Sequence, residues 1–150
     1  MVRINRDGKP ASEFRRAERG DVRSIAAGSK SEFNRELTDR DEHQSRMRMA
    51  ELIGEIEKLT ERLGKSFDIN DLMKYKRLVQ GFLKEATSLA FSLQKDSSFH
   101  RRGRAIMLSV RTVNQDVEAL ISDFTNKKRE PTEILESMDK IRGMLLDMLV

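Results

Sequence analysis

The sequence predicts an all-α protein, an antiparallel four-helix bundle with a flexible basic N-terminal arm. Apolar residues recur at steps of three and four in four separate segments, which is the spacing of one helix face. The chain has only two prolines and no tryptophan, and its β-branched residues are few and scattered, which argues against an all-β fold. Its 150 residues provide for one domain with a core of its own.

The first 37 residues form the predicted arm. They show no sustained apolar period, and they are interrupted at Gly8, Pro10, Gly20 and Gly28. They hold nine Lys/Arg and six Asp/Glu, whereas residues 38–150 hold twenty and nineteen. The net charge of +4 is therefore concentrated in the arm. We expect residues 1–37 to be mostly disordered and to form short helices on binding, and a tail without a role is the alternative.

The bundle domain is expected to span residues 38–150. Thr38 or Asp39 is a suitable N-cap for its first helix, and Gly64 is a suitable stop. Between them one apolar stripe is formed by Met49, Leu52, Ile56, Leu59 and Leu63. Ser66 or Asp68 can cap the second helix. Its stripe is Leu72, Tyr75, Val79, Phe82, Ala86, Leu89 and Leu93, widened by Ile69, Leu78, Leu83 and Ala90.

The polar stretch from Gln94 to Arg104 predicts a loop. The third helix then presents Ile106, Val110, Val113, Val117, Leu120 and Phe124. Pro131 suits the first turn of a fourth helix, whose stripe is Ile134, Met138, Ile141, Leu145 and Leu149. Short connections make neighbouring helices antiparallel. The sequence does not choose between a monomer and a homodimer that exchanges its first or last helices.

The candidate binding site is the predicted loop, with Lys95, Phe99, His100, Arg101, Arg102 and Arg104. Arginines beside an aromatic ring can hold phosphates or an acidic partner. Alternatively, Phe99 packs under the loop as a cap on the bundle. We expect the three arginines to be solvated, so that replacing all of them with glutamate leaves the melting temperature unchanged or slightly higher. Met47 and Met49 are a second candidate contact surface.

No motif predicts a catalytic centre, a cofactor or a metal ion. Gly64-Lys65-Ser66 resembles the end of a P-loop, but Leu59 stands where the motif needs a glycine and no strand precedes it. His43 and His100 lack any ligand spacing, and there are no cysteines. The longest apolar runs are too short for a membrane span. A cytoplasmic location is therefore expected.

Several segments resemble the YaaR-like family of small bacterial proteins. The most specific is Asp71-Leu-Met-Lys-Tyr-Lys-Arg-Leu-Val-Gln-Gly-Phe-Leu-Lys-Glu-Ala86. Ser98-Phe99 with Gly103-Arg104, Ile134-Leu135 and Ile141-Arg-Gly-Met-Leu-Leu146 match in order and spacing. The resemblance covers residues 45–150 and implies a helical bundle of bacterial cytoplasmic origin, with no established activity. The arm is longer and richer in arginine than the family pattern.

These observations favour a non-enzymatic cytoplasmic interaction protein that binds a protein partner by helix packing or through its basic arm and loop. The alternative is an accessory nucleic-acid-binding protein that uses the arm and the Arg101–Arg104 segment. A steep loss of affinity with salt distinguishes the second function from the first.

Overall fold

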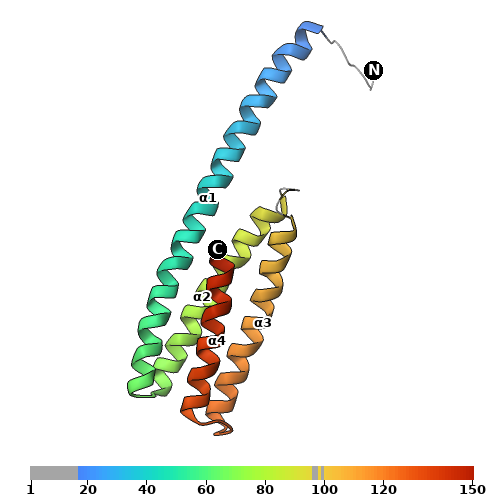
Figure 1. Ribbon diagram of the computed structural model, residues 1–150. Coiled ribbons are helices and arrows are strands. Elements are labelled where there is room, and N and C mark those ends of the chain that lie inside the picture. The colour runs from blue at the N-terminus through green and yellow to red at the C-terminus, as the bar shows by residue number, and fades with distance from the viewer. Residues whose placement is uncertain (1–16, 96–97, 99) are drawn as a thin grey trace. The chain divides into compact units, whose positions relative to one another are not determined.

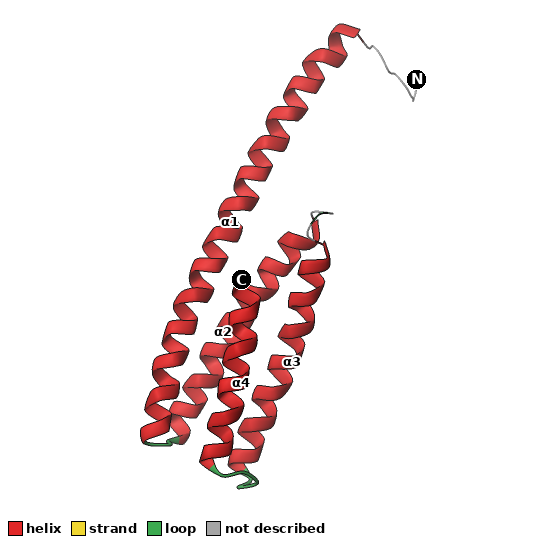
Figure 2. Cartoon of the chain, viewed as in Figure 1, coloured by secondary structure: helices red, strands yellow, loops and turns green. Residues whose placement is uncertain are grey.

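The computed structural model describes the backbone of residues 17–95, 98 and 100–150, with side chains from residue 32 onward. Within these residues the regular elements are four helices and no strands (Figures 1 and 2). The helices are α1 (Ala17–Lys65), α2 (Ile69–Lys95), α3 (His100–Thr125) and α4 (Pro131–Leu149). The chain divides into two compact units, Met1–Arg40 and Asp41–Val150. The predicted all-α class is confirmed.

The first unit corrects the predicted helix start. Helix α1 begins at Ala17, so neither Thr38 nor Asp39 is its N-cap. The reason is local, because the segment is rich in alanine, glutamate and arginine, which favour the helix even without an apolar stripe. All described side chains from residue 32 to residue 40 are at least partly exposed. Residues 1–16 lie outside the described residues, and the flexibility of the arm stays a prediction.

The second unit is the four-helix bundle, and contacts between side chains fix its register. Between neighbouring helices, residues farther along one helix contact residues nearer the start of the other, as antiparallel neighbours must. Helices α1 and α2 are joined by Arg62–Asp71 and Arg48–Glu85, and α2 and α3 by Lys76–Glu118. Helix α4 returns to α1 through Arg142–Glu57 and through Arg46, which donates to the Leu149 carbonyl oxygen. The predicted antiparallel order is confirmed.

The core of the bundle is built from the predicted stripes. Helix α2 contributes the largest share, with Leu72, Tyr75, Val79, Phe82, Leu83, Ala86, Leu89, Ala90 and Leu93 buried. The stripes of α1, α3 and α4 face it, although Leu52, Val110, Phe124 and Leu149 are only partly buried. Ile69 is exposed, contrary to expectation, because it is the first residue of α2.

The starts of α2 and α4 agree with the capping rules, whereas α1 continues through Gly64, the predicted stop, to Lys65. The Asp68 carboxylate accepts a hydrogen bond from the Asn70 backbone N–H at 3.3 Å, so Asp68 caps α2 as predicted. Pro131 is in the first turn of α4, also as predicted. Glu130 and Glu133 form a capping box on either side of it, in which the Glu130 backbone N–H donates to the Glu133 carboxylate at 2.9 Å. The sequence analysis missed this box because Glu is an uncommon N-cap residue.

The connection between α2 and α3 is shorter than predicted. Helix α2 continues to Lys95 and α3 begins at His100, so most of the expected Gln94–Arg104 loop is helical. Gly103 had been interpreted as a loop residue, but it lies inside α3 and is buried against α2. A Cβ atom at this position would lie 2.7 Å from the Ala90 carbonyl oxygen. Glycine here permits a close helix contact.

Candidate interaction surface

The structure places five of the six predicted site residues at the junction of α2 and α3. Lys95 is the last residue of α2, and His100, Arg101, Arg102 and Arg104 belong to the first turns of α3. Phe99 lies outside the described residues. Lys95, His100, Arg101 and Arg104 are exposed, as expected. The His100 ring Nδ1 lies 3.3 Å from the Gln94 carbonyl oxygen, across the connection.

Arg102 corrects the expectation that all three arginines are solvated. Its side chain is half-buried and its guanidinium donates to the carbonyl oxygens of Asp147, at 3.2 Å, and Val150. From the opposite side Arg46 donates to the Leu149 carbonyl oxygen at 3.0 Å. The last carbonyls of a helix have no partners within the helix and carry the negative end of its dipole. Arg102 and Arg46 therefore tie the end of α4 to α3 and α1.

Replacing Arg102 should consequently destabilise the bundle. Arg102→Glu removes the hydrogen bonds and puts a negative charge beside the negative end of α4, so we expect a loss of about 1–2 kcal/mol in the free energy of unfolding. Arg101→Glu and Arg104→Glu are matched controls and should each change it by less than about 0.5 kcal/mol. Denaturant unfolding measures all three. Equal effects at the three positions would show that the α4 contact contributes nothing.

Further exposed residues continue the group of cations at the α2–α3 junction along the outer side of both helices. On α2, Lys84, Phe91 and Lys95 follow each other at steps of seven and four, which keeps them on one side. On α3 the steps of three, four and three place Arg101, Arg104, Leu108 and Arg111 together. We call these seven residues the basic surface. Phe91 is 58% exposed and Leu108 is 62% exposed, which is unusual for large apolar side chains.

The contact at Gly103 brings the two halves of the basic surface together. Gly103 lies against Ala90, and the next residue along each helix, Arg104 and Phe91, turns outward from this contact. Farther along, a shallow groove runs between α2 and α3, and its lining includes Lys84, Thr87 and Arg111. Cations from both helices therefore flank one groove.

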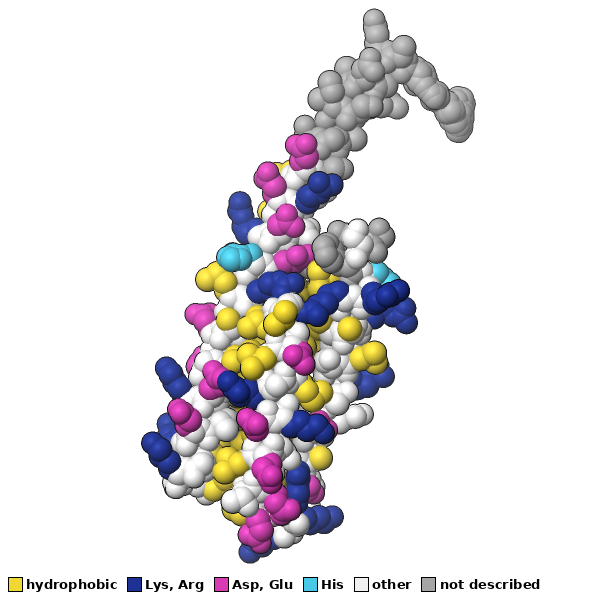
Figure 3. Space-filling view, in the orientation of Figure 1, with side chains coloured by type: hydrophobic (Ala, Val, Ile, Leu, Met, Phe, Trp, Pro, Cys, Tyr) yellow, Lys and Arg dark blue, Asp and Glu magenta, His cyan; other side chains and the backbone are white. Residues whose placement is uncertain are grey.

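The cations of the basic surface have no partners among the described residues. No ion pair or side-chain hydrogen bond is formed there by Lys84, Lys95, Arg101, Arg104 or Arg111. Between Ala86 and Gln115 the only acidic residue is Asp96, which lies outside the described part of the chain. Figure 3 shows Lys and Arg side chains near the end of the bundle where α3 begins. The surface is therefore positive and uncompensated within the described structure.

Phe91, Leu108, Lys84 and Arg111 were not selected from the sequence. The signal that could have found Phe91 and Leu108 is their phase, because each lies two residues from a stripe position, Leu89 and Ile106, and so points away from the core. Arg111 and Lys84 carried no such signal. They belong to the basic surface because the register of α2 against α3 places them beside its other residues.

The hypothesis that Met47 and Met49 form a contact surface is wrong for Met49. Met49 is fully buried in the core and cannot form a contact surface, whereas Met47 is exposed. The step of three from Met49 to Leu52 already marked Met49 as a stripe residue.

A second polar feature lies in the core. Tyr75 is fully buried and its hydroxyl has no hydrogen-bond partner in the described structure. Burial raises the pKa of this hydroxyl above its usual value, so it stays neutral and acts as part of the core.

Within the described residues no three His, Asp or Glu side chains converge as metal ligands. The same residues contain no helix with an apolar stretch long enough to cross a bilayer.

The fold and the basic surface define a small helical-bundle protein whose outer α2–α3 face combines cations with exposed apolar side chains. The chain belongs to the family described as "Protein of unknown function (DUF327)", which matches residues 5–149. It is similar to the "Uncharacterized protein YaaR" of Bacillus subtilis (strain 168), with 27% identity over 115 residues, which is 74% of this chain and 79% of the relative. The resemblance to the YaaR-like family is thus confirmed. Comparison with solved structures finds no match.

Proposed function

We propose that this protein is a non-enzymatic interaction protein of the bacterial cytoplasm that binds an acidic segment of a partner protein on its basic surface. The observation that carries the proposal is the uncompensated cluster of exposed Lys and Arg residues around Phe91 and Leu108. Phenylalanine and arginine are enriched in protein interfaces. An aromatic anchor surrounded by cations would give affinity through Phe91 and orientation through the charges.

The cations of the basic surface are not explained by a contribution to the stability of the bundle. Arg101 and Arg104 are three residues apart on α3, and like charges at this spacing repel each other. Neither forms an ion pair in the described structure. Binding of carboxylates would remove the repulsion and would make the affinity fall with salt, though less steeply than the affinity for a nucleic acid.

Nucleic-acid binding is the alternative, and Phe91 beside Arg104 is the feature that favours it, because a base can stack on an exposed ring while arginine holds the phosphate. Leu108 favours the protein partner, since an aliphatic side chain provides no stacking surface. The small net charge of residues 38–150, twenty Lys/Arg against nineteen Asp/Glu, also favours a local acidic segment over a long polyanion.

Defined probes can distinguish the two. We suggest fluorescence anisotropy with a labelled, non-helical peptide of aspartate, glutamate, glycine and phenylalanine, and with a labelled single-stranded oligonucleotide. The acidic peptide should bind more tightly than the oligonucleotide at matched salt. In the double variant Arg104→Glu with Arg111→Glu, the dissociation constant for the peptide should rise at least about tenfold, equivalent to about 1.4 kcal/mol.

The matched control is Lys128→Glu with Lys140→Glu, which makes the same change in charge at two exposed positions outside the basic surface. It should leave the peptide affinity unchanged. If both double variants lose affinity equally, binding follows net charge and the proposed surface is wrong. Preferential binding of the oligonucleotide, lost in Arg104→Glu with Arg111→Glu, would replace the protein partner by nucleic acid.

A further inference from the structure

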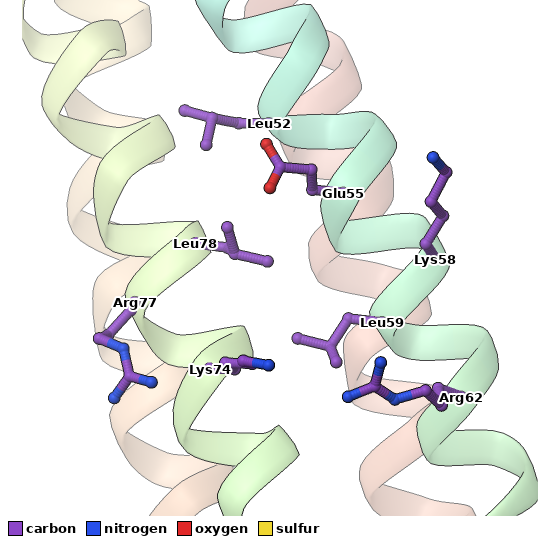
Figure 4. Close-up of a pocket in the computed structure, with 8 residues that line it drawn as sticks. All are labelled: Leu52, Glu55, Lys58, Leu59, Arg62, Lys74, Arg77 and Leu78. Carbon is purple, nitrogen blue, oxygen red and sulfur yellow. The ribbon is translucent and has the colours of Figure 1, made fainter.

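A second surface feature lies on the bundle between α1 and α2. It is a groove of about 370 Å³ lined by Leu52, Glu55, Lys58, Leu59, Arg62, Lys74, Arg77 and Leu78. Figure 4 shows Leu52, Leu59 and Leu78 pointing into the space between the two helices. Leu59 is buried, and Leu52 and Leu78 are half-buried. The floor of the groove is therefore apolar and open to an additional side chain.

The rim of the groove is positive. Arg62 is held by Asp71, with 2.7 Å between its Nη2 and the carboxylate, and this contact lowers the pKa of Asp71. Lys58, Lys74 and Arg77 are exposed and have no ion-pair partner in the described structure. Glu55 is the only carboxylate in the lining. An occupant that fits would bring apolar side chains flanked by carboxylates.

The first unit, Met1–Arg40, contains a segment that combines apolar side chains with carboxylates. In α1, Phe33 is 60% exposed and Leu37 is 41% exposed, and they lie one helical turn apart on the same side. Glu32 and Glu36 directly precede them in sequence, and Asp39 follows. Arg35 is the only cation between residues 32 and 39. The segment is thus a helical turn with two apolar side chains beside three carboxylates.

We propose that residues 32–39 of a second copy of this chain occupy the α1–α2 groove. Phe33 and Leu37 would pack on the three leucines, and the carboxylates, which lie on one side of this apolar pair, would face Lys74 and Arg77 on the α2 side of the groove. Every copy has both the segment and the groove, and the proposed dimer is one in which two copies exchange their segments reciprocally, with twofold symmetry. This contact uses a different face from the basic surface on α2 and α3, so it does not depend on the proposed function.

The test is sedimentation equilibrium of the full chain over a range of concentrations. The protein should reach a dimer. A segment variant, Glu32→Lys with Glu36→Lys, and a groove variant, Lys74→Glu with Arg77→Glu, should each raise the dimer dissociation constant at least about tenfold. All four positions are exposed, and circular dichroism checks that both variants remain helical.

Mixing the two variants gives the sharper result. In a mixed dimer the basic segment of one variant faces the acidic groove of the other, and the remaining contact is unchanged, so the equimolar mixture should dimerise again. The control Lys128→Glu with Lys140→Glu should dimerise normally, as should Arg104→Glu with Arg111→Glu. A protein that is monomeric at every concentration, or a dimer unaffected by either charge change, overturns the proposal. Failure of the mixture to recover would also overturn it.

Discussion

Val113→Asp should lower the free energy of unfolding by about 3–5 kcal/mol, a larger effect than we expect of the other single substitutions. Val113 is completely buried in α3, within a stripe that includes Ile106 and Val117. An aspartate there has no cation or donor within its stripe, so it must either be buried without a partner or open the bundle. Chemical denaturation followed by circular dichroism measures the loss.

The control is Gln115→Asp, which adds the same carboxylate two residues away on the exposed side of α3. It should cost less than about 0.5 kcal/mol. Glu118→Lys should also change stability by well under about 1 kcal/mol, although it breaks the ion pair with Lys76, because exposed pairs contribute little. Similar losses for Val113→Asp and Gln115→Asp would mean that the phase of α3 is wrong.

Gly103→Ala should destabilise the bundle, although alanine is the better helix former. The new Cβ would lie 2.7 Å from both the Ala90 carbonyl oxygen and the Gln94 Cγ. The carbonyl is fixed in α2 and cannot move aside, so α2 and α3 must separate. We expect a cost of about 1–3 kcal/mol, which exceeds the gain of about 1 kcal/mol in helix propensity.

Gly143→Ala is the matched control, because an added Cβ at this exposed position in α4 would have no atom within 4 Å. It should stabilise the protein by up to about 1 kcal/mol. The two substitutions are chemically identical and should have opposite signs in thermal or denaturant unfolding. A gain in stability at Gly103 would show that the helices can part without cost and that the close contact is not needed.

The solvent exposure of the candidate binding residues was only partly predicted from the sequence. Lys95, Arg101 and Arg104 are exposed as expected, but Arg102 contacts the end of α4. The spacing along one helix shows on which side a residue lies. It does not show that the end of another helix lies next to that residue. The partners of Arg102 are 45 and 48 residues away in sequence, so no local pattern indicates them.

The sequence by itself determined the class of fold, most of the stripes that form the core and the family, and it narrowed the cap of α2 to Ser66 or Asp68. These follow from the helical period and from local hydrogen-bonding preferences, which act within a few residues. Only the tertiary structure decided that Gly103 is a packing residue, that Arg102 supports α4, and that Phe91 and Arg104 share one face. The register between α2 and α3 sets these features, and it depends on the fit of two surfaces distant in the chain.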